Sequence, residues 1–131
     1  MKITYVDTSI LVGMLFEEKE AHKWKRFLNT KDDTVSSALV EAELLAAAAR
    51  EKVDLALAFS FLESVTLLHP DRSLKEEYTK VFSIGYIRGA DACHLASALF
   101  LDPEAKTVSF LTADTQQRHI AAKLGFETPS L

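Results

Sequence analysis

Two aspartates follow short apolar runs near the two ends of the chain. Asp7 comes directly after residues 3–6 (ITYV), and Asp114 closely follows residues 110–111 (FL). Both runs predict buried strands, and in an open parallel sheet ligands bind outside the carboxyl ends of the strands. A carboxylate at that edge is placed to contact a ligand. Each aspartate could equally cap the helix that follows it, and Asp114 with Gln117 fits a capping box.

A third aspartate, Asp91, lies in the apolar segment GADACHLASALFL. The positions three, four and seven residues later are His94, Leu95 and Ala98, so its helical face is small or apolar. A carboxylate there would be largely removed from water and must be paired, protonated or bound to a cation. Stabilisation by the N-terminal helix dipole, about 0.3 to 1 kcal/mol at an exposed site, is the structural alternative.

The fourth acidic candidate is one of two glutamates in the segment SSALVEAELLAAA, Glu41 or Glu43. On a helix, the centre of the apolar face formed by the neighbouring side chains lies about midway between the two glutamates. Helical periodicity therefore does not show which of them faces the interior. A solvated glutamate on an amphipathic helix is the structural alternative for either residue.

Alternating strand and helix patterns separate these acidic residues. Apolar runs predict strands at residues 2–7, 34–36, 65–69 and 107–112. Helical patterns predict helices at residues 8–16, 19–29, 38–52, 54–64, 73–88, 90–101 and 115–124. Gly89 and Gly125 are the expected stops of two of these helices. The alternation predicts an α/β fold with parallel strands and helices on both faces of the sheet.

Composition narrows the class of protein. With 131 residues, 48% of them hydrophobic, the chain predicts one domain over residues 1–131. The net charge of -4 excludes a basic coat that binds nucleic acid by bulk electrostatics, so a phosphate-rich partner needs a local basic patch or metal ions. A single cysteine, a polar N-terminal segment and the lack of a long apolar stretch predict a soluble, reduced, cytoplasmic protein without membrane contact.

Four blocks of the sequence together resemble the PIN-domain ribonucleases, and in particular the VapC-type toxins of toxin–antitoxin pairs. These blocks are YVDTSILVGML, VSSALVEAELL, GADACHLASAL and FLTADTQQRHIAAKLG. They cover nearly the whole chain, in order and at family-like spacing. The resemblance implies a PIN-like α/β domain whose parallel sheet has about five strands flanked by helices.

The resemblance also implies a site. It makes Asp7, Glu43, Asp91 and Asp114 a metal-binding acidic cluster, which Thr112 supports as a small hydroxyl residue two places before the last acid. Glu43 is preferred to Glu41 because the family's acid directly precedes the helical leucine. The implied function is a metal-dependent endoribonuclease, with a small cognate antitoxin as partner and a homodimeric assembly.

A divalent cation would explain the acidic composition. Carboxylates brought together raise one another's pKa unless a cation neutralises them. Mg²⁺ or Mn²⁺ suits this task because such hard ions bind a few carboxylate oxygens, keep waters and accept phosphate oxygens. We expect one or two ions to lower the pKa of a water that attacks an RNA phosphodiester.

Several other residues receive weaker predictions. His94 is expected to be a packed, hydrogen-bonded side chain, and Cys93 a small core residue. Arg88 and Arg118 could guide a phosphate backbone or simply form a solvated rim. Trp24 and Phe27, both in the segment AHKWKRFL, are expected to pack in a helix interface.

Two alternatives use the same acids differently. An aspartyl-phosphate enzyme would need a second aspartate two residues after Asp7, where Ser9 stands. A PIN-like binding or assembly module would use the acids only to cap helices and to pair with Arg88 or Arg118.

Overall fold

A parallel sheet forms the centre of the molecule in the computed structural model, which describes residues 2–31 and 33–131. Its strands in that part of the chain are β1 (Ile3–Val6), β2 (Asp33–Ser37), β3 (Thr66–Leu68) and β4 (Val108–Leu111), in the order β3-β2-β1-β4. Every pairing is parallel, so all the strands end at one edge. The chain moves from β1 outward to β3 and then crosses to the other side of β1. The strand order therefore reverses between β1 and β4, where open α/β sheets bind ligands.

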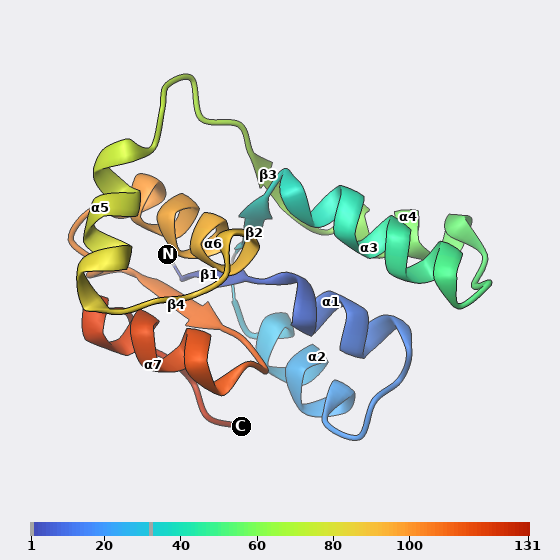
Figure 1. The fold of residues 1–131 in the computed structure, drawn as a ribbon. Coiled ribbons are helices and arrows are strands. Elements are labelled where there is room, and N and C mark those ends of the chain that lie inside the picture. The colour runs from blue at the N-terminus through green and yellow to red at the C-terminus, as the bar shows by residue number, and fades with distance from the viewer. Residues whose placement is uncertain (1, 32) are drawn as a thin grey trace.

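Helices cover both faces of this sheet (Figure 1). They are α1 (Thr8–Leu15), α2 (Ala21–Asn29), α3 (Leu39–Arg50), α4 (Leu55–Glu63), α5 (Lys75–Ile84), α6 (Gly89–Leu101) and α7 (Thr115–Leu124). Helix α1 contacts α2, α3 and α4, whereas α5 contacts α6 and α7. Within residues 2–31 and 33–131, no helix has the length and apolar character needed to cross a membrane. The predicted α/β class, with helices on both faces, is confirmed.

Alternation along β1 and β4 divides the apolar core into two clusters. Tyr5 and its register partner Phe110 stack with ring centroids 5.2 Å apart, in the cluster formed with α5, α6 and α7. Val6 and Leu111, which are also register partners, belong to the cluster formed with α1 to α4. Successive side chains of a strand point to opposite faces, so both faces of β1 and β4 are anchored up to the last strand residue. The polar residues that follow are therefore held in fixed positions.

Helices α1 and α2 pack closely through Trp24 and Gly13. Trp24 is buried, and a Cβ atom at Gly13 would lie 2.3 Å from Trp24 Cζ3. Any larger residue at position 13 would push the indole away from α1. The predicted packing role of Trp24 is confirmed.

The sheet is slightly smaller than the expected one of about five strands. Beyond β4, the described chain contributes only an isolated parallel bridge between Ser109 and Glu127, in which Phe110 N–H donates to Glu127 O at 2.8 Å. The segment after α7 thus lies where a further strand would lie, but it makes too few ladder hydrogen bonds to count as one.

One predicted helix boundary is wrong. The helix expected over residues 73–88 ends at Ile84, because Gly85 adopts an extended conformation. Ile87 is fully buried in the core, and Arg88 has the extended backbone of a residue that precedes α6. Residues 85–88 therefore form an extended connection that positions the start of α6, where Asp91 lies.

Candidate functional site

Asp7 lies directly after β1, at the edge where the strand order reverses. It occupies the N-cap position of α1, yet its side chain makes no capping hydrogen bond. Instead, Oδ1 accepts from Ser9 Oγ at 2.6 Å and Oδ2 accepts from Thr112 Oγ1 at 2.9 Å. The residue is 3% exposed, and burial raises the pKa of its carboxyl group to about 6, against the opposing effect of these hydrogen bonds. A capping role does not account for this side chain.

Thr112 fixes Asp7 from the end of β4. Its hydroxyl is buried, lies 3.1 Å from Gln117 Oε1, and accepts from the Asp114 backbone N–H at 3.0 Å. The Gln117 amide in turn donates to the Asp91 carbonyl oxygen at 3.0 Å. Thr112 and the fully buried Gln117 therefore tie the end of β4 to the first turns of both α6 and α7. The structure thus brings Thr112 into contact with Asp7, one of the predicted acids.

Asp114 caps helix α7. Its Oδ1 accepts from the Gln117 backbone N–H at 2.8 Å, as the capping-box pattern predicts. The reciprocal half of the box is not formed, because the Gln117 side chain is used by Thr112 and Asp91. Of the predicted acids, Asp114 is the one with a clear local structural role.

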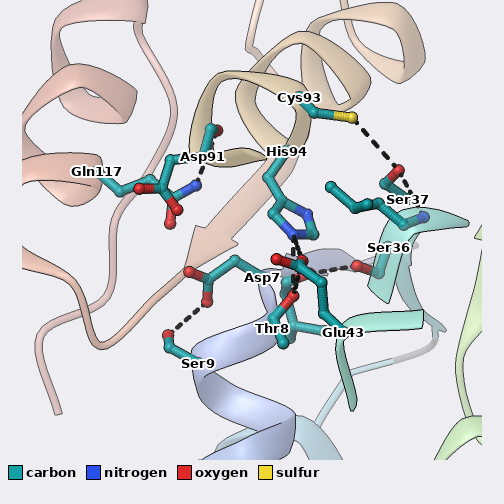
Figure 2. A network of polar contacts seen from close by, with 12 residues as sticks. Asp7, Thr8, Ser9, Ser36, Ser37, Glu43, Asp91, Cys93, His94 and Gln117 are labelled. Atoms are coloured by element: carbon teal, nitrogen blue, oxygen red, sulfur yellow. Dashed lines mark hydrogen bonds and ion pairs between the residues drawn. The ribbon is translucent and has the colours of Figure 1, made fainter. Parts of the chain in front are cut away.

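Asp91 lies in the first turn of α6, and its side chain is 18% exposed. Its Oδ2 lies 3.4 Å from Nε of Arg88, whose side chain is 77% exposed. The charge of Asp91 also contributes to the raised pKa of Asp7, so the two carboxylates lie within electrostatic reach. Figure 2 draws Asp7 between Asp91 on one side and the Glu43–His94 pair on the other.

The choice between the two glutamates is made by contacts with distant residues. Glu41 is exposed, whereas Glu43 accepts at Oε1 from Thr8 Oγ1 at 2.5 Å and lies 3.2 Å from His94 Nε2. The hydrogen bond with His94 is the main reason why the pKa of Glu43 lies below its usual range. Glu43 is thus the glutamate that reaches the strand-end network.

His94 is more closely connected to these acids than its sequence context indicates. It is 1% exposed, as predicted for a packed and hydrogen-bonded histidine, and its Nδ1 lies 2.8 Å from the Tyr5 hydroxyl. Thr8 Oγ1 lies 3.1 Å from Nε2. The only sequence signal for His94 is its spacing of one helical turn from Asp91, which does not indicate the contacts with Thr8 and Glu43.

Sequence reasoning predicted Thr112 but missed two other hydroxyl groups that hold the acids, those of Ser9 and Thr8. Ser9 donates to Asp7 and accepts from the Ala113 backbone N–H at 3.0 Å, so it joins α1 to the end of β4. The Thr8 hydroxyl likewise donates a hydrogen bond to the Glu43 carboxylate. The local pattern of both residues indicates only helix capping, and it does not connect Thr8 to a partner more than 30 residues away.

The remaining basic and thiol residues border this site. Arg118 Nη2 donates to the Thr112 carbonyl oxygen at 2.9 Å, whereas the Arg88 side chain extends into solvent. Cys93 differs from its prediction as a core residue, because it is only half-buried and its Sγ faces Ser37 Oγ at 3.7 Å. Each arginine is thus tied to a residue of the site, Arg88 to Asp91 and Arg118 to Thr112.

The donor set suits an open site for a hard divalent cation. Asp7, Glu43 and Asp91 bring carboxylate oxygens from separate elements, and such oxygens are preferred ligands of Mg²⁺. Among the residues that the structure describes, no group of three or more Asp, Glu, His or Cys side chains is arranged so that it could hold a metal ion. Mg²⁺ is commonly held by one or two protein carboxylates, with waters and substrate phosphates completing its shell. The arrangement fits that kind of site rather than an all-protein cage.

Comparison with known proteins agrees with this reading of the fold. The profile of the PIN domain matches residues 4–123. Among solved structures, that of VapBC-1 from nontypeable Haemophilus influenzae is similar, with a TM-score of 0.70 over 98% of this chain and 97% of that chain, at 17% identity. No curated protein matches the sequence significantly. PIN domains are generally nucleases, and PIN nucleases generally use divalent metals. Because the match spans nearly the whole sequence, the chain belongs to the PIN domain family.

Proposed function

We propose that this protein is a divalent-metal-dependent endoribonuclease that hydrolyses RNA phosphodiester bonds. The observation that carries the proposal is the carboxylate of Asp7, which is buried at the β1–β4 edge and held by hydroxyl groups rather than by a helix-capping hydrogen bond. Burying a charge is costly unless it is paired or binds a metal. A side chain kept in this position by two hydroxyl groups fits a cation-binding role.

Asp7 and Asp91 would hold Mg²⁺ or Mn²⁺, with Glu43 and Asp114 as the other predicted members of the site. When bound, such an ion lowers the pKa of a water and stabilises charge on a reacting phosphate. Thr112 and Ser9 orient the Asp7 carboxylate, which is mostly ionised at neutral pH with a pKa of about 6. Arg88 and Arg118 flank the acids and would contact phosphates next to the scissile bond.

Metal-dependent RNA cleavage is the direct test. Purified protein is incubated with single-stranded and structured RNAs, with Mg²⁺ or Mn²⁺ or with EDTA. Cleavage that needs the metal and disappears in Asp91→Asn supports the proposal. Full activity in Asp91→Asn, or equal cleavage in EDTA, contradicts it.

We further propose that the protein is the toxin of a toxin–antitoxin pair, acting in the cytoplasm, bound by a small antitoxin and assembling as a homodimer. The fold similarity to VapBC-1 supports this assignment. Exposed apolar side chains offer surface for such contacts, namely Leu55, Leu57, Phe59, Phe82 and Tyr86. Induced expression should arrest growth of a bacterial host, and Asp91→Asn should abolish the arrest. Arrest by both forms contradicts a toxin that acts through this site.

A catalytically inactive PIN-like binding module is the alternative. Two observations favour it: Asp114 caps α7, and Asp91 already pairs with Arg88. The two functions differ in their response to metal. A nuclease should gain about 1.4 kcal/mol of unfolding free energy at Mg²⁺ or Mn²⁺ concentrations ten times the dissociation constant, and Asp91→Asn should lose this gain. Melting curves unaffected by either metal favour the binding module.

A further inference from the structure

A chain of buried hydrogen bonds runs from the end of β2 to Glu43. The Ser37 backbone N–H donates to the Tyr5 hydroxyl at 3.0 Å, and that hydroxyl lies 2.8 Å from His94 Nδ1. On the other side of the ring, His94 Nε2 lies 3.2 Å from Glu43 Oε1. Tyr5 and His94 are closed off from solvent, whereas the Glu43 side chain is 34% exposed. The chain therefore leads from the core to a partly exposed carboxylate, and Figure 2 shows its end at His94 and Glu43.

Counting donors and acceptors assigns the hydrogen atoms in this chain. The ionised Glu43 carboxylate can only accept, and the Thr8 hydroxyl, 3.1 Å from His94 Nε2, gives its own hydrogen to Glu43. Both groups therefore face Nε2 as acceptors, and Nε2 carries a hydrogen. In a neutral imidazole that carries its hydrogen at Nε2, Nδ1 accepts, so the Tyr5 hydroxyl, which already accepts from Ser37, gives its own hydrogen to Nδ1. Tyr5 thus selects the ring form of His94 that donates toward Glu43.

The imidazole is also held rigidly in space. The Tyr5 ring stacks on Phe110 and meets the His94 ring edge-on, with centroids 5.8 Å apart and an interplanar angle of 73°. His94 lies on α6, and its neighbour Leu95 is fully buried in the same core cluster. Glu43, by contrast, is a partly exposed side chain on α3 that is also hydrogen-bonded to the Thr8 hydroxyl. Its position relative to the strand-end acids is therefore set by His94 together with the Thr8 hydroxyl.

We propose that His94, oriented by Tyr5, is a positioning residue that holds the Glu43 carboxylate toward the divalent cation of the site. This inference rests on the proposed function, because it assumes that the site binds a cation. His94 does not itself touch the ion or the substrate; it acts through Glu43, as hydrogen-bond partners of metal ligands commonly do.

Two substitutions of His94 separate positioning from simple packing. In His94→Gln, the amide nitrogen replaces Nε2 and keeps a donor toward Glu43. In His94→Asn, the shorter amide matches Nδ1 and keeps only the contact with Tyr5. His119, an exposed histidine on α7, supplies the matched control His119→Asn.

Mn²⁺ affinity, measured by electron paramagnetic resonance on the RNA-free protein, is the readout. We expect His94→Asn to bind Mn²⁺ about 10- to 100-fold more weakly, the usual cost of losing a partner of a metal ligand, and His94→Gln to stay within about threefold of the wild type. Equal affinity in His94→Asn and the wild type overturns the inference. Absence of Mn²⁺ binding by the wild type contradicts the proposed function itself, so the two failures are distinguishable.

A double-mutant cycle and a metal-free measurement complete the test. If His94 acts through Glu43, His94→Asn should weaken Mn²⁺ binding no further in a Glu43→Gln background, whereas additive losses overturn the inference. Nitrogen NMR of the metal-free wild type should show His94 protonated at Nε2 and accepting at Nδ1, and Tyr5→Phe should change that signature. A ring protonated only at Nδ1 contradicts the assignment, even if His94→Asn fails to fold.

Discussion

Asp7 and Glu77 are both buried acids, yet the protein treats them in opposite ways. Glu77, on α5, is 7% exposed and receives two hydrogen bonds from the Arg72 guanidinium, at 3.0 and 2.7 Å, which lower the pKa of its carboxyl group. Asp7 is 3% exposed, receives hydrogen bonds from hydroxyl groups, and has a raised pKa.

The ionised Glu77 carboxylate adds to the free energy of unfolding, whereas the ionised Asp7 carboxylate reduces it. The Glu77 carboxylate is satisfied by a partner from its own segment, five residues away. Hydroxyl groups compensate the charge of Asp7 less completely than a guanidinium would, and its ionisation costs folding free energy. Natural proteins commonly accept such a cost at functional sites.

The largest expected effect is that of Asp7→Asn, which should move activity and stability in opposite directions. Loss of an ionic ligand should lower metal-dependent RNA cleavage at least about 100-fold, because loss of an outer hydrogen-bond partner alone costs 10- to 100-fold. Removing the buried charge should raise the unfolding free energy at pH 7 by up to about 3 kcal/mol, at about 1.4 kcal/mol per pKa unit. Cleavage assays and metal-free urea denaturation measure the two effects. An unfolding free energy of Asp7→Asn below that of the wild type would mean that the ionised Asp7, like Glu77, stabilises the fold, and would contradict the comparison.

The stability gained by Asp7→Asn should depend on pH. Burial raises the pKa of the Asp7 carboxyl group from its ordinary value of 3.8 to about 6 in the folded state, so ionisation favours the unfolded chain. In the wild type, the stability associated with protonated Asp7 is fully present below about pH 4 and is lost as pH rises through about 6. The difference between the two proteins in metal-free urea denaturation should therefore grow from near zero at pH 4 to its maximum at pH 7. A difference that is constant over this range contradicts the raised pKa.

Glu77→Gln should have the converse and smaller effect. It removes a charge whose folded-state pKa is lowered, so it should reduce the unfolding free energy at pH 7 by about 1 kcal/mol, a value discounted for the solvent around Arg72. The contribution of Glu77 is present above its ordinary pKa and is lost as pH falls below it. RNA cleavage should stay at the wild-type level. Loss of cleavage with an intact fold would mean that the pair is not purely structural.

The smallest effect is expected from the hydroxyl groups around Asp7. Ser9→Ala removes the hydrogen bond that lowers the pKa of Asp7 most, and Thr112→Val removes a weaker one. Both variants should raise that pKa above about 6, Ser9→Ala by more, as measured by carbon NMR titration of the Asp7 carboxyl group without metal. An unchanged pKa in Ser9→Ala would show that burial alone sets its value.

The parts of the fold that depend on local patterns could be predicted from the sequence. The apolar runs before Asp7 and Asp114 correctly indicated β1 and β4, and the capping box correctly indicated the start of α7. The end of α5 was mispredicted because the helical pattern continues beyond Gly85. Burial of Ile87 in the core, a tertiary interaction, overrides that pattern.

The site was harder to predict because distant contacts define it. Glu43 differs from Glu41 through a bond to His94, which is 51 residues away, and helical periodicity contains no information on that contact. Gln117 matched a local capping pattern, but its amide joins Thr112 to Asp91 instead. The resemblance of the whole sequence to a family selected Glu43, whereas residue patterns alone left the choice open.

The pairing of β1 with β4 also determines when the site can exist. Asp7 and Thr112 are separated by 105 residues, and Thr8 and His94 by 86. During synthesis the N-terminal part of a chain emerges first, so Asp7 is exposed to the cell long before its partners. A nascent chain that lacks β4 has none of the Thr112 contacts and cannot carry out chemistry that depends on them. Any chemistry that depends on these contacts therefore requires the whole domain to have been synthesised and the sheet to have closed.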